Sequence, residues 1–167
     1  MKKSFTLIEL IFVLVIIGLL ASFAVPKFMQ TRVSASATSA ASVVSSVRTA
    51  IEAKHGEWII NDDLDTTDGY TPQGYPQKLD DAKLNSANED LFNGTSKLKL
   101  LKKGIKSCLK NDCWYKKSED NDKNLSDYIY KFNDKDYVQL EYNGSNGMFE
   151  CVDSNSKTKE ECESFIK

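Results

Sequence analysis

The hydrophobic positions of this chain are concentrated near its beginning. An almost continuous apolar run of 21 residues covers 5–25, and mostly polar sequence follows it. A helix of that length extends about 31 Å, which is enough to cross a hydrocarbon core of about 30 Å. The pattern therefore predicts a membrane-spanning helix joined to a polar domain.

A second helical pattern follows the apolar run. Within 27–56, apolar residues recur at steps of three and four: Val33, Ala37, Ala40, Val44, Val47 and Ile51. These steps place one apolar stripe along a helix, and its small side chains allow close approach to a sheet. We expect Gly56 to end this helix, with His55 on the surface in its last turn.

Alternation with period two appears late in the chain. It predicts three strands and the two polar turns between them: 128–132, 133–136, 137–142, 143–147 and 148–152. Trp114–Tyr115 is expected to add a fourth strand, and 78–92 one short helix. An antiparallel meander needs an apolar cover, which the helical stripe can supply. The predicted fold class is therefore α+β, with a long N-terminal helix packed on a small antiparallel sheet.

Charge and side-chain chemistry narrow the function. The balance of 22 basic against 24 acidic residues, a net charge of −2, argues against dedicated nucleic-acid binding. The lysine-rich stretch 97–110 has little aromatic interleaving, which favours a solvated face over a DNA or anionic-lipid contact. His55 is the single histidine. Without a phosphate loop, a nucleophile elbow or a histidine partner for a cysteine nucleophile, we expect no enzymatic activity.

Two acidic segments raise the question of a calcium site. In the segment that begins at Asp63, Asp68 stands where a calcium-binding EF-hand loop needs glycine, and Gly74 stands where it needs glutamate. The segment 119–122 also lacks the required glycine. We therefore expect solvated turns and no cofactor, with calcium kept as an alternative.

Glu9 is the one ionisable residue inside the apolar run. A carboxylate at the centre of a membrane-spanning helix costs about 2.5–3.5 kcal/mol, and less near the interface. No lysine or arginine lies within 5–25 to neutralise it. A cut after Ser4 would create a positive α-amine at Phe5, and that amine could neutralise Glu9 within one chain or on a neighbouring helix.

The order Lys2-Lys3-Ser4 followed by Phe5-Thr6-Leu7-Ile8-Glu9-Leu10 resembles the prepilin N-terminus of type IV pilins and type II secretion pseudopilins. The resemblance implies that a peptidase on the cytoplasmic side cuts between Ser4 and Phe5 and methylates the Phe5 amine. It also implies that Glu9 guides subunit assembly. Ser4 stands where the family usually has glycine.

The resemblance implies an organisation in four parts: a leader at 1–4, a transmembrane and assembly helix at 5–26, an amphipathic helix at 27–56 and a globular head at 57–167. Gly18 and Pro26 stand where the family often has glycine and proline. The segment between them is either a weak point, which the resemblance implies would loosen on assembly, or an ordinary kink near the membrane interface.

A pilin-like chain would sit in the bacterial inner membrane as a single-pass protein, with its N-terminus in the cytoplasm and its head outside. It would then pass into a periplasmic or extracellular filament. The implied partners are homo- or hetero-oligomeric pilin subunits, the prepilin peptidase, the inner-membrane assembly platform and the membrane. Lys2 and Lys3 agree with a cytoplasmic N-terminus.

The four cysteines allow three disulfide connectivities or one zinc site: Cys108, Cys113, Cys151 and Cys162. The tight hook of two cysteines separated by two residues is absent, and an extracytoplasmic head favours disulfides. We favour sequential pairing, and related pilins often close a C-terminal loop in this way.

Two further hypotheses remain beside the filament subunit. One is a monomeric, membrane-anchored domain that binds calcium or DNA outside the cytoplasm. The other is a soluble domain released by cleavage after Ala24, but the apolar run is longer than an ordinary signal-peptide core of about 7–15 residues. Glu9 discriminates, because a simple anchor or a signal peptide has no need of a carboxylate.

Overall fold

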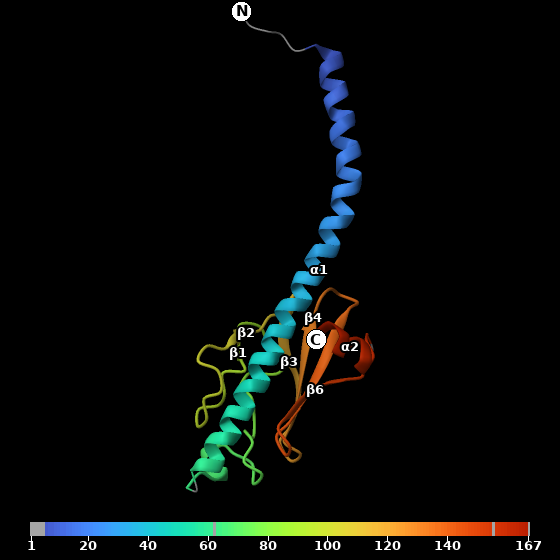
Figure 1. The fold of residues 1–167 in the computed structure, drawn as a ribbon. Helices are drawn as coiled ribbons and strands as arrows, with labels where there is room; N and C mark the ends of the chain where they lie inside the picture. Colours follow the sequence, from blue (N-terminus) through green and yellow to red (C-terminus); the bar gives the residue numbers. More distant parts are fainter. Residues whose placement is uncertain (1–5, 62, 155, 167) are drawn as a thin grey trace, which may run out of the picture. The chain divides into compact units, whose positions relative to one another are not determined.

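The structure is a computed structural model that describes residues 6–61, 63–154 and 156–166. The chain divides into two compact units, 1–36 and 37–167. Helix α1 (Leu7–Ile60) includes residues of both units (Figure 1). Each unit is described by itself below.

The first unit contains the apolar part of α1. Gly18 and Pro26 both lie within the helix, and a Cβ added at Gly18 would meet open space. The segment between them, proposed above as a weak point, is helical in this structure. Loosening of this segment during assembly therefore stays a prediction.

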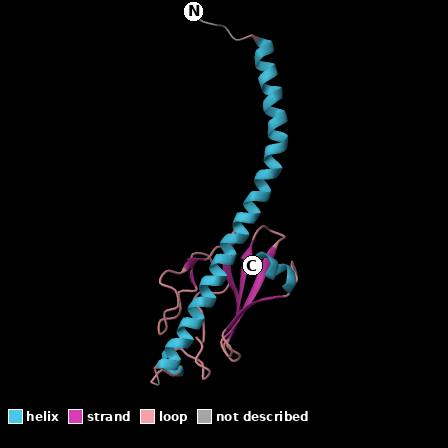
Figure 2. Cartoon of the chain, in the orientation of Figure 1, coloured by secondary structure: helices cyan, strands magenta, loops and turns pink. Residues whose placement is uncertain are grey.

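The second unit contains a four-stranded antiparallel sheet in the order β3-β4-β5-β6 (Figure 2). Its strands are β3 (Cys113–Asp120), β4 (Leu125–Lys131), β5 (Tyr137–Asn143) and β6 (Met148–Val152). This order confirms the predicted meander and the fourth strand at Trp114–Tyr115. The strand extends to Asp120, further than expected.

Smaller elements complete the second unit: the 3-10 helix η1 (Thr66–Asp68), a two-stranded sheet of β1 (Asp90–Leu91) and β2 (Ile105–Lys106), and helix α2 (Lys159–Ile166). Helix α2 was not predicted. It is short, and its apolar side chains are few, so the sequence pattern around it is weak.

The core of the second unit lies between α1 and the four-stranded sheet. The stripe residues Ala40, Val44, Val47 and Ile51 are at most 1% exposed and share one apolar cluster with Leu140 and Tyr142 of β5 and Phe149 of β6. Burial along β5 alternates strictly, as a sheet with one covered face requires. The stripe predicted from the sequence therefore packs as expected from Ala40 onward.

Two predictions of local structure are wrong. Helix α1 continues past Gly56 to Ile60, because its last turn packs on other residues: the His55 ring stacks on Tyr75, and the Trp58 ring lies against Gly74. Tertiary contact here outweighs the helix-ending tendency of glycine.

The segment 78–92 forms no helix within its described backbone. The Asp80 carboxylate accepts hydrogen bonds from the backbone N–H groups of Ala82 and Phe92, at 3.2 and 3.0 Å. Asn85 and Asn88 adopt positive φ angles of 49° and 64°. Asparagine tolerates this left-handed conformation, and the side-chain bonds of Asp80 replace those of a helix.

Two glycines allow a matched test of this fold. In Gly56→Ala, the new methyl group meets open space inside a helix, so the free energy of unfolding should rise by about 0.5–1 kcal/mol. Gly94 has a φ of +84°, and an added Cβ would meet the backbone of Leu98 and Leu100. We expect Gly94→Ala to lower the free energy of unfolding by about 1–3 kcal/mol.

The measurement is urea unfolding of the purified full chain in detergent, followed by tryptophan fluorescence. Equal midpoints for the two variants would contradict the described backbone at both positions.

Candidate functional site

Glu9 and Thr6 form a reciprocal hydrogen-bond arrangement at the start of α1. The backbone N–H of Glu9 donates to Thr6 Oγ1 at 3.3 Å. In return, Thr6 donates to Glu9 Oε2 through its backbone N–H at 3.4 Å and through its hydroxyl at 3.2 Å. This arrangement is a capping box, which satisfies backbone donors that a helix start leaves unpaired.

The capping box gives Glu9 an uncharged partner in its own segment, where the sequence contains no lysine or arginine. This partner is Thr6, three residues earlier. The spacing Thr-x-x-Glu before an apolar run was the available signal. The positive end of the helix dipole also favours a negative charge at this position.

The apolar side chains of the first unit are exposed wherever the structure describes them. Leu7 and Phe23, for example, are 77% and 78% exposed. The helix contains a window with a mean hydropathy of 2.8, long and apolar enough to cross a membrane by length and composition. Exposed apolar surface on this scale calls for lipid or for other apolar helices as a cover. The predicted cleavage and methylation positions, Ser4 and Phe5, lie outside the described residues.

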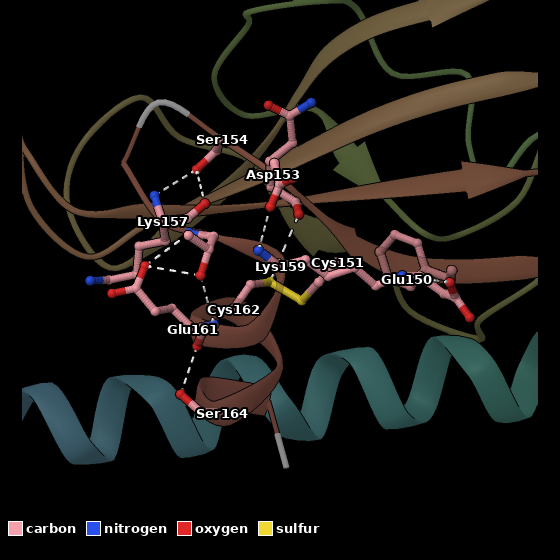
Figure 3. Close-up of a disulfide and its surroundings, with 12 residues drawn as sticks. Glu150, Cys151, Asp153, Ser154, Lys157, Lys159, Glu161, Cys162 and Ser164 are labelled. Carbon is pink, nitrogen blue, oxygen red and sulfur yellow. Dashed lines mark hydrogen bonds and ion pairs between the residues drawn. A yellow bond between two sulfur atoms is a disulfide. The ribbon is translucent and has the colours of Figure 1, made fainter.

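Two disulfides stabilise the second unit. Cys108 pairs with Cys113 at the start of β3, with a Cα–Cα distance of 5.7 Å. Cys151 of β6 pairs with Cys162 of α2, with a Cα–Cα distance of 5.9 Å (Figure 3). This is the sequential pairing favoured above. All four cysteines are engaged, so none is left as a thiolate ligand for zinc.

Local hydrogen bonds fix the start of α2, the helix that contains Cys162 of the second disulfide (Figure 3). Thr158 and Glu161 form a second capping box, in which Glu161 Oε2 accepts from the Thr158 backbone N–H at 2.9 Å. That bond lowers the pKa of Glu161. Asp153 Oδ1 accepts the backbone N–H of Lys159 at 2.7 Å. Helix α2 thus starts at a defined place beside β6.

In the acidic segments considered for calcium, carboxylates accept hydrogen bonds from neighbouring residues. Asp65 accepts the Thr67 backbone N–H and hydroxyl, both at 2.6 Å, which lowers the pKa of Asp65 and caps η1. Asp120 accepts the backbone N–H of Asp122 at 3.1 Å. No group of three His, Cys, Asp or Glu side chains suited to a metal ion occurs among the described residues.

Glu119 has a different role from its neighbours in the acidic segment. Its carboxylate forms ion pairs with Lys78 and Lys116. Burial alone would raise the pKa of Glu119, but the bonds to these two lysines outweigh it and lower the pKa below its usual value. The sequence suggested an acidic turn here, and the lysine partners are visible only in the folded chain.

Two further predictions concern the surface of the second unit. The lysines of 97–110 are exposed, and Lys106 pairs with Asp90 at 2.9 Å. His55 is half-buried, with its ring 4.0 Å from that of Tyr75 and its Nδ1 3.2 Å from the Gly74 carbonyl oxygen. The expected surface position of His55 is therefore only partly right.

Comparisons with known proteins find matches at the start of the chain. Residues 1–25 match the family model of the prokaryotic N-terminal methylation motif. Two fimbrial proteins of Pseudomonas aeruginosa are each 44% identical to this chain over 52 residues, which is 31% of this chain and 34% of each relative. The match thus covers only about a third of the length of these curated relatives. No solved structure matches the chain significantly.

These matches confirm the resemblance to type IV pilins in the N-terminal part of the chain. The chain carries a prokaryotic N-terminal methylation motif at 1–25, and an exposed apolar helix begins within that motif.

Both disulfides make a direct prediction about thiol chemistry. All four cysteines should resist alkylation until the protein is reduced, and peptide mapping should recover the links Cys108–Cys113 and Cys151–Cys162. The double variant Cys151→Ser/Cys162→Ser should lose about 2–3 kcal/mol of unfolding free energy, because its loop spans 11 residues in the chain-entropy model. A link between Cys113 and Cys151 would contradict the described pairing.

Proposed function

We propose that this chain is a non-enzymatic, self-assembling subunit of a type IV pilus-like filament or of a type II secretion pseudopilus. The observation that carries the proposal is the methylation motif at 1–25 joined to a helix whose apolar side chains are exposed. An apolar helix of this kind is covered by lipid before assembly and by the helices of neighbouring subunits afterwards. The second unit, with its own core, is the head that the helix carries.

In this proposal, cleavage of the leader creates the positively charged partner of Glu9. A membrane peptidase on the cytoplasmic side removes 1–4, methylates Phe5 and leaves a positive α-amine there. In the filament this amine, on a packed neighbouring subunit, meets the Glu9 carboxylate. The capping box supports this role, because Thr6 engages Oε2 of Glu9 and holds the carboxylate at the very start of the helix.

Localisation follows from the same proposal. The chain crosses the inner membrane once, with Lys2 and Lys3 on the cytoplasmic side. The head then lies outside the cytoplasm, where the two disulfides are stable. The assembly platform in the inner membrane extracts the subunit into the filament.

The first test concerns the mature N-terminus. Peptide mass spectrometry of membrane-extracted protein should find a chain that begins at Phe5 with a methylated amine. A mature chain that begins at Met1 or at Val25 would contradict processing by a prepilin peptidase.

The second test separates the charge of Glu9 from its capping role. In Glu9→Gln the amide still accepts the Thr6 hydrogen bonds, so the helix start is preserved while the charge is lost. Insertion and head folding should be unchanged. Filament growth should stop, because a partly desolvated ion pair that loses one member costs about 3–5 kcal/mol at each added subunit. The measurement compares sheared surface filaments with the amount of subunit in the membrane fraction.

Thr6→Val is the matched control, because it removes the hydroxyl of the capping box and keeps the Glu9 charge. It should still form filaments. Normal filaments from Glu9→Gln alone would favour the alternative of a monomeric membrane-anchored domain that binds calcium or DNA. Loss of filaments in Thr6→Val as severe as in Glu9→Gln would assign the effect to the helix cap.

A further inference from the structure

A lysine and an aspartate meet inside the head with no access to solvent. Lys116 of β3 and Asp80 of the connection before β1 have fully buried side chains, each 0% exposed. Lys116 Nζ lies 3.2 Å from Asp80 Oδ1 and 3.4 Å from the Asp80 carbonyl oxygen. A buried ion pair of this kind is costly to desolvate, so its presence calls for an explanation.

The second oxygen of the Asp80 carboxylate faces two hydrogen-bond donors. Asp80 Oδ2 accepts the backbone N–H of Phe92 at 3.0 Å and the hydroxyl of Tyr128 at 3.0 Å. The two donors reach this oxygen from different parts of the chain, because Phe92 directly follows β1 and Tyr128 lies in β4. Such a pair of donors stabilises negative charge that develops on an oxygen during acyl transfer.

A third ionisable group touches the lysine. Glu119 forms an ion pair with Lys116 through Oε2, and its side chain is 15% exposed. In a regular strand, residues three positions apart point to opposite faces. The register of β3 shifts between Lys116 and Ser118, and this irregularity brings Glu119 to the side of Lys116.

We propose that Lys116 and Asp80 form an intramolecular isopeptide bond, with Glu119 as the proton carrier. The nucleophile Lys116 contacts both the acyl group of Asp80 and the proton carrier Glu119, and the two oxygen-stabilising donors contact Asp80 Oδ2. Burial excludes water that would compete with the lysine nitrogen or reverse the reaction. This inference is independent of the filament function proposed above.

The reaction balances without any added reagent. The Lys116 ammonium passes one proton to Asp80 Oδ1, which leaves a neutral amine and a neutral carboxylic acid. The amine nitrogen then attacks Asp80 Cγ, a C–N bond forms, and the negative charge moves to Oδ2, where Phe92 N–H and Tyr128 O–H donate to it.

Glu119 completes the reaction by taking a proton from the attacking nitrogen and delivering it to Oδ1. The Cγ–Oδ1 bond breaks, Oδ1 departs as water, and the Cγ–Oδ2 double bond is restored. Two of the three ammonium hydrogens leave in the water, and the third stays on the amide nitrogen. Glu119 returns to its starting carboxylate form, so it acts as a catalytic residue.

The bond would join the connection between α1 and β3, which contains Asp80, to the four-stranded sheet, which contains Lys116. The connection between α1 and β3 contains, among its described residues, only η1 and the two short strands β1 and β2. A covalent link from Asp80 to Lys116 ties the middle of this connection to the main sheet. A connection so anchored would resist being pulled from the sheet under load.

The test is peptide mapping of the full chain purified from membranes, after reduction and alkylation. Wild-type protein should yield a branched peptide that contains both Asp80 and Lys116, with a mass lower than the two separate peptides by one water. No proteolytic cut should occur after Lys116. The readout is confined to the head, so it does not depend on N-terminal processing or on filament formation.

Three variants define the roles. Lys116→Met removes the nucleophile and should abolish the branched peptide. Glu119→Gln keeps the size of the side chain but removes the proton carrier, so the linked fraction should fall at least tenfold after equal incubation. Asp120→Asn changes the next residue, the last of β3, whose side chain is 42% exposed. It is the matched control and should be linked as fully as wild type.

Two results would overturn the isopeptide. One is wild-type protein whose Asp80 and Lys116 peptides stay separate after prolonged incubation. The other is a loss of water that maps only to the Asp68–Gly69 peptide, where cyclisation of the aspartate produces the same mass change. Full linkage in folded Glu119→Gln would remove Glu119 from the mechanism. The wild-type map decides the bond itself even if a variant fails to fold.

Discussion

The head depends on one apolar contact, between the stripe of α1 and the inner face of the four-stranded sheet. Val44, Val47 and Ile51 are buried against side chains from β5 and β6. Each side chain of this size contributes about 1.5–3 kcal/mol when it is removed from water. Without this cover the sheet would expose a continuous apolar face. The helix and the sheet are held together by this contact, so the long connections of the head can lack regular secondary structure and still pack on a fixed core.

Asp80 organises the least regular part of the head. Its carboxylate bonds to two backbone N–H groups, to the Tyr128 hydroxyl and to Lys116. A buried carboxylate is tolerated only when such partners satisfy it. Burial, with the Asp80 charge beside it, raises the pKa of Tyr128 well above its usual value, which keeps the hydroxyl proton in place as a donor. The bonds to the Asp80 carboxylate therefore decide the backbone conformation of 78–92, and the helix propensity of this segment does not.

The two units of the chain meet different physical demands. The head buries its own apolar residues and closes its ends with disulfides and caps, so its stability is internal. The first unit leaves its apolar side chains exposed, so a lipid or protein environment has to cover them. Glu9 lies in this first unit, where the bonds from Thr6 satisfy one of its two carboxylate oxygens.

Contiguous sequence alone determined the methylation motif, the helical stripe and the alternating strands, because each is encoded in residues a few positions apart. The strands and turns of 128–152 and the stripe from Ala40 were therefore predictable. Only the tertiary structure decided that Asp80 pairs with Lys116, 36 residues away, that Glu119 joins them, and that α1 continues past Gly56. These features depend on which side chains the folded core brings together, and local periodicity carries no information about contacts between distant residues.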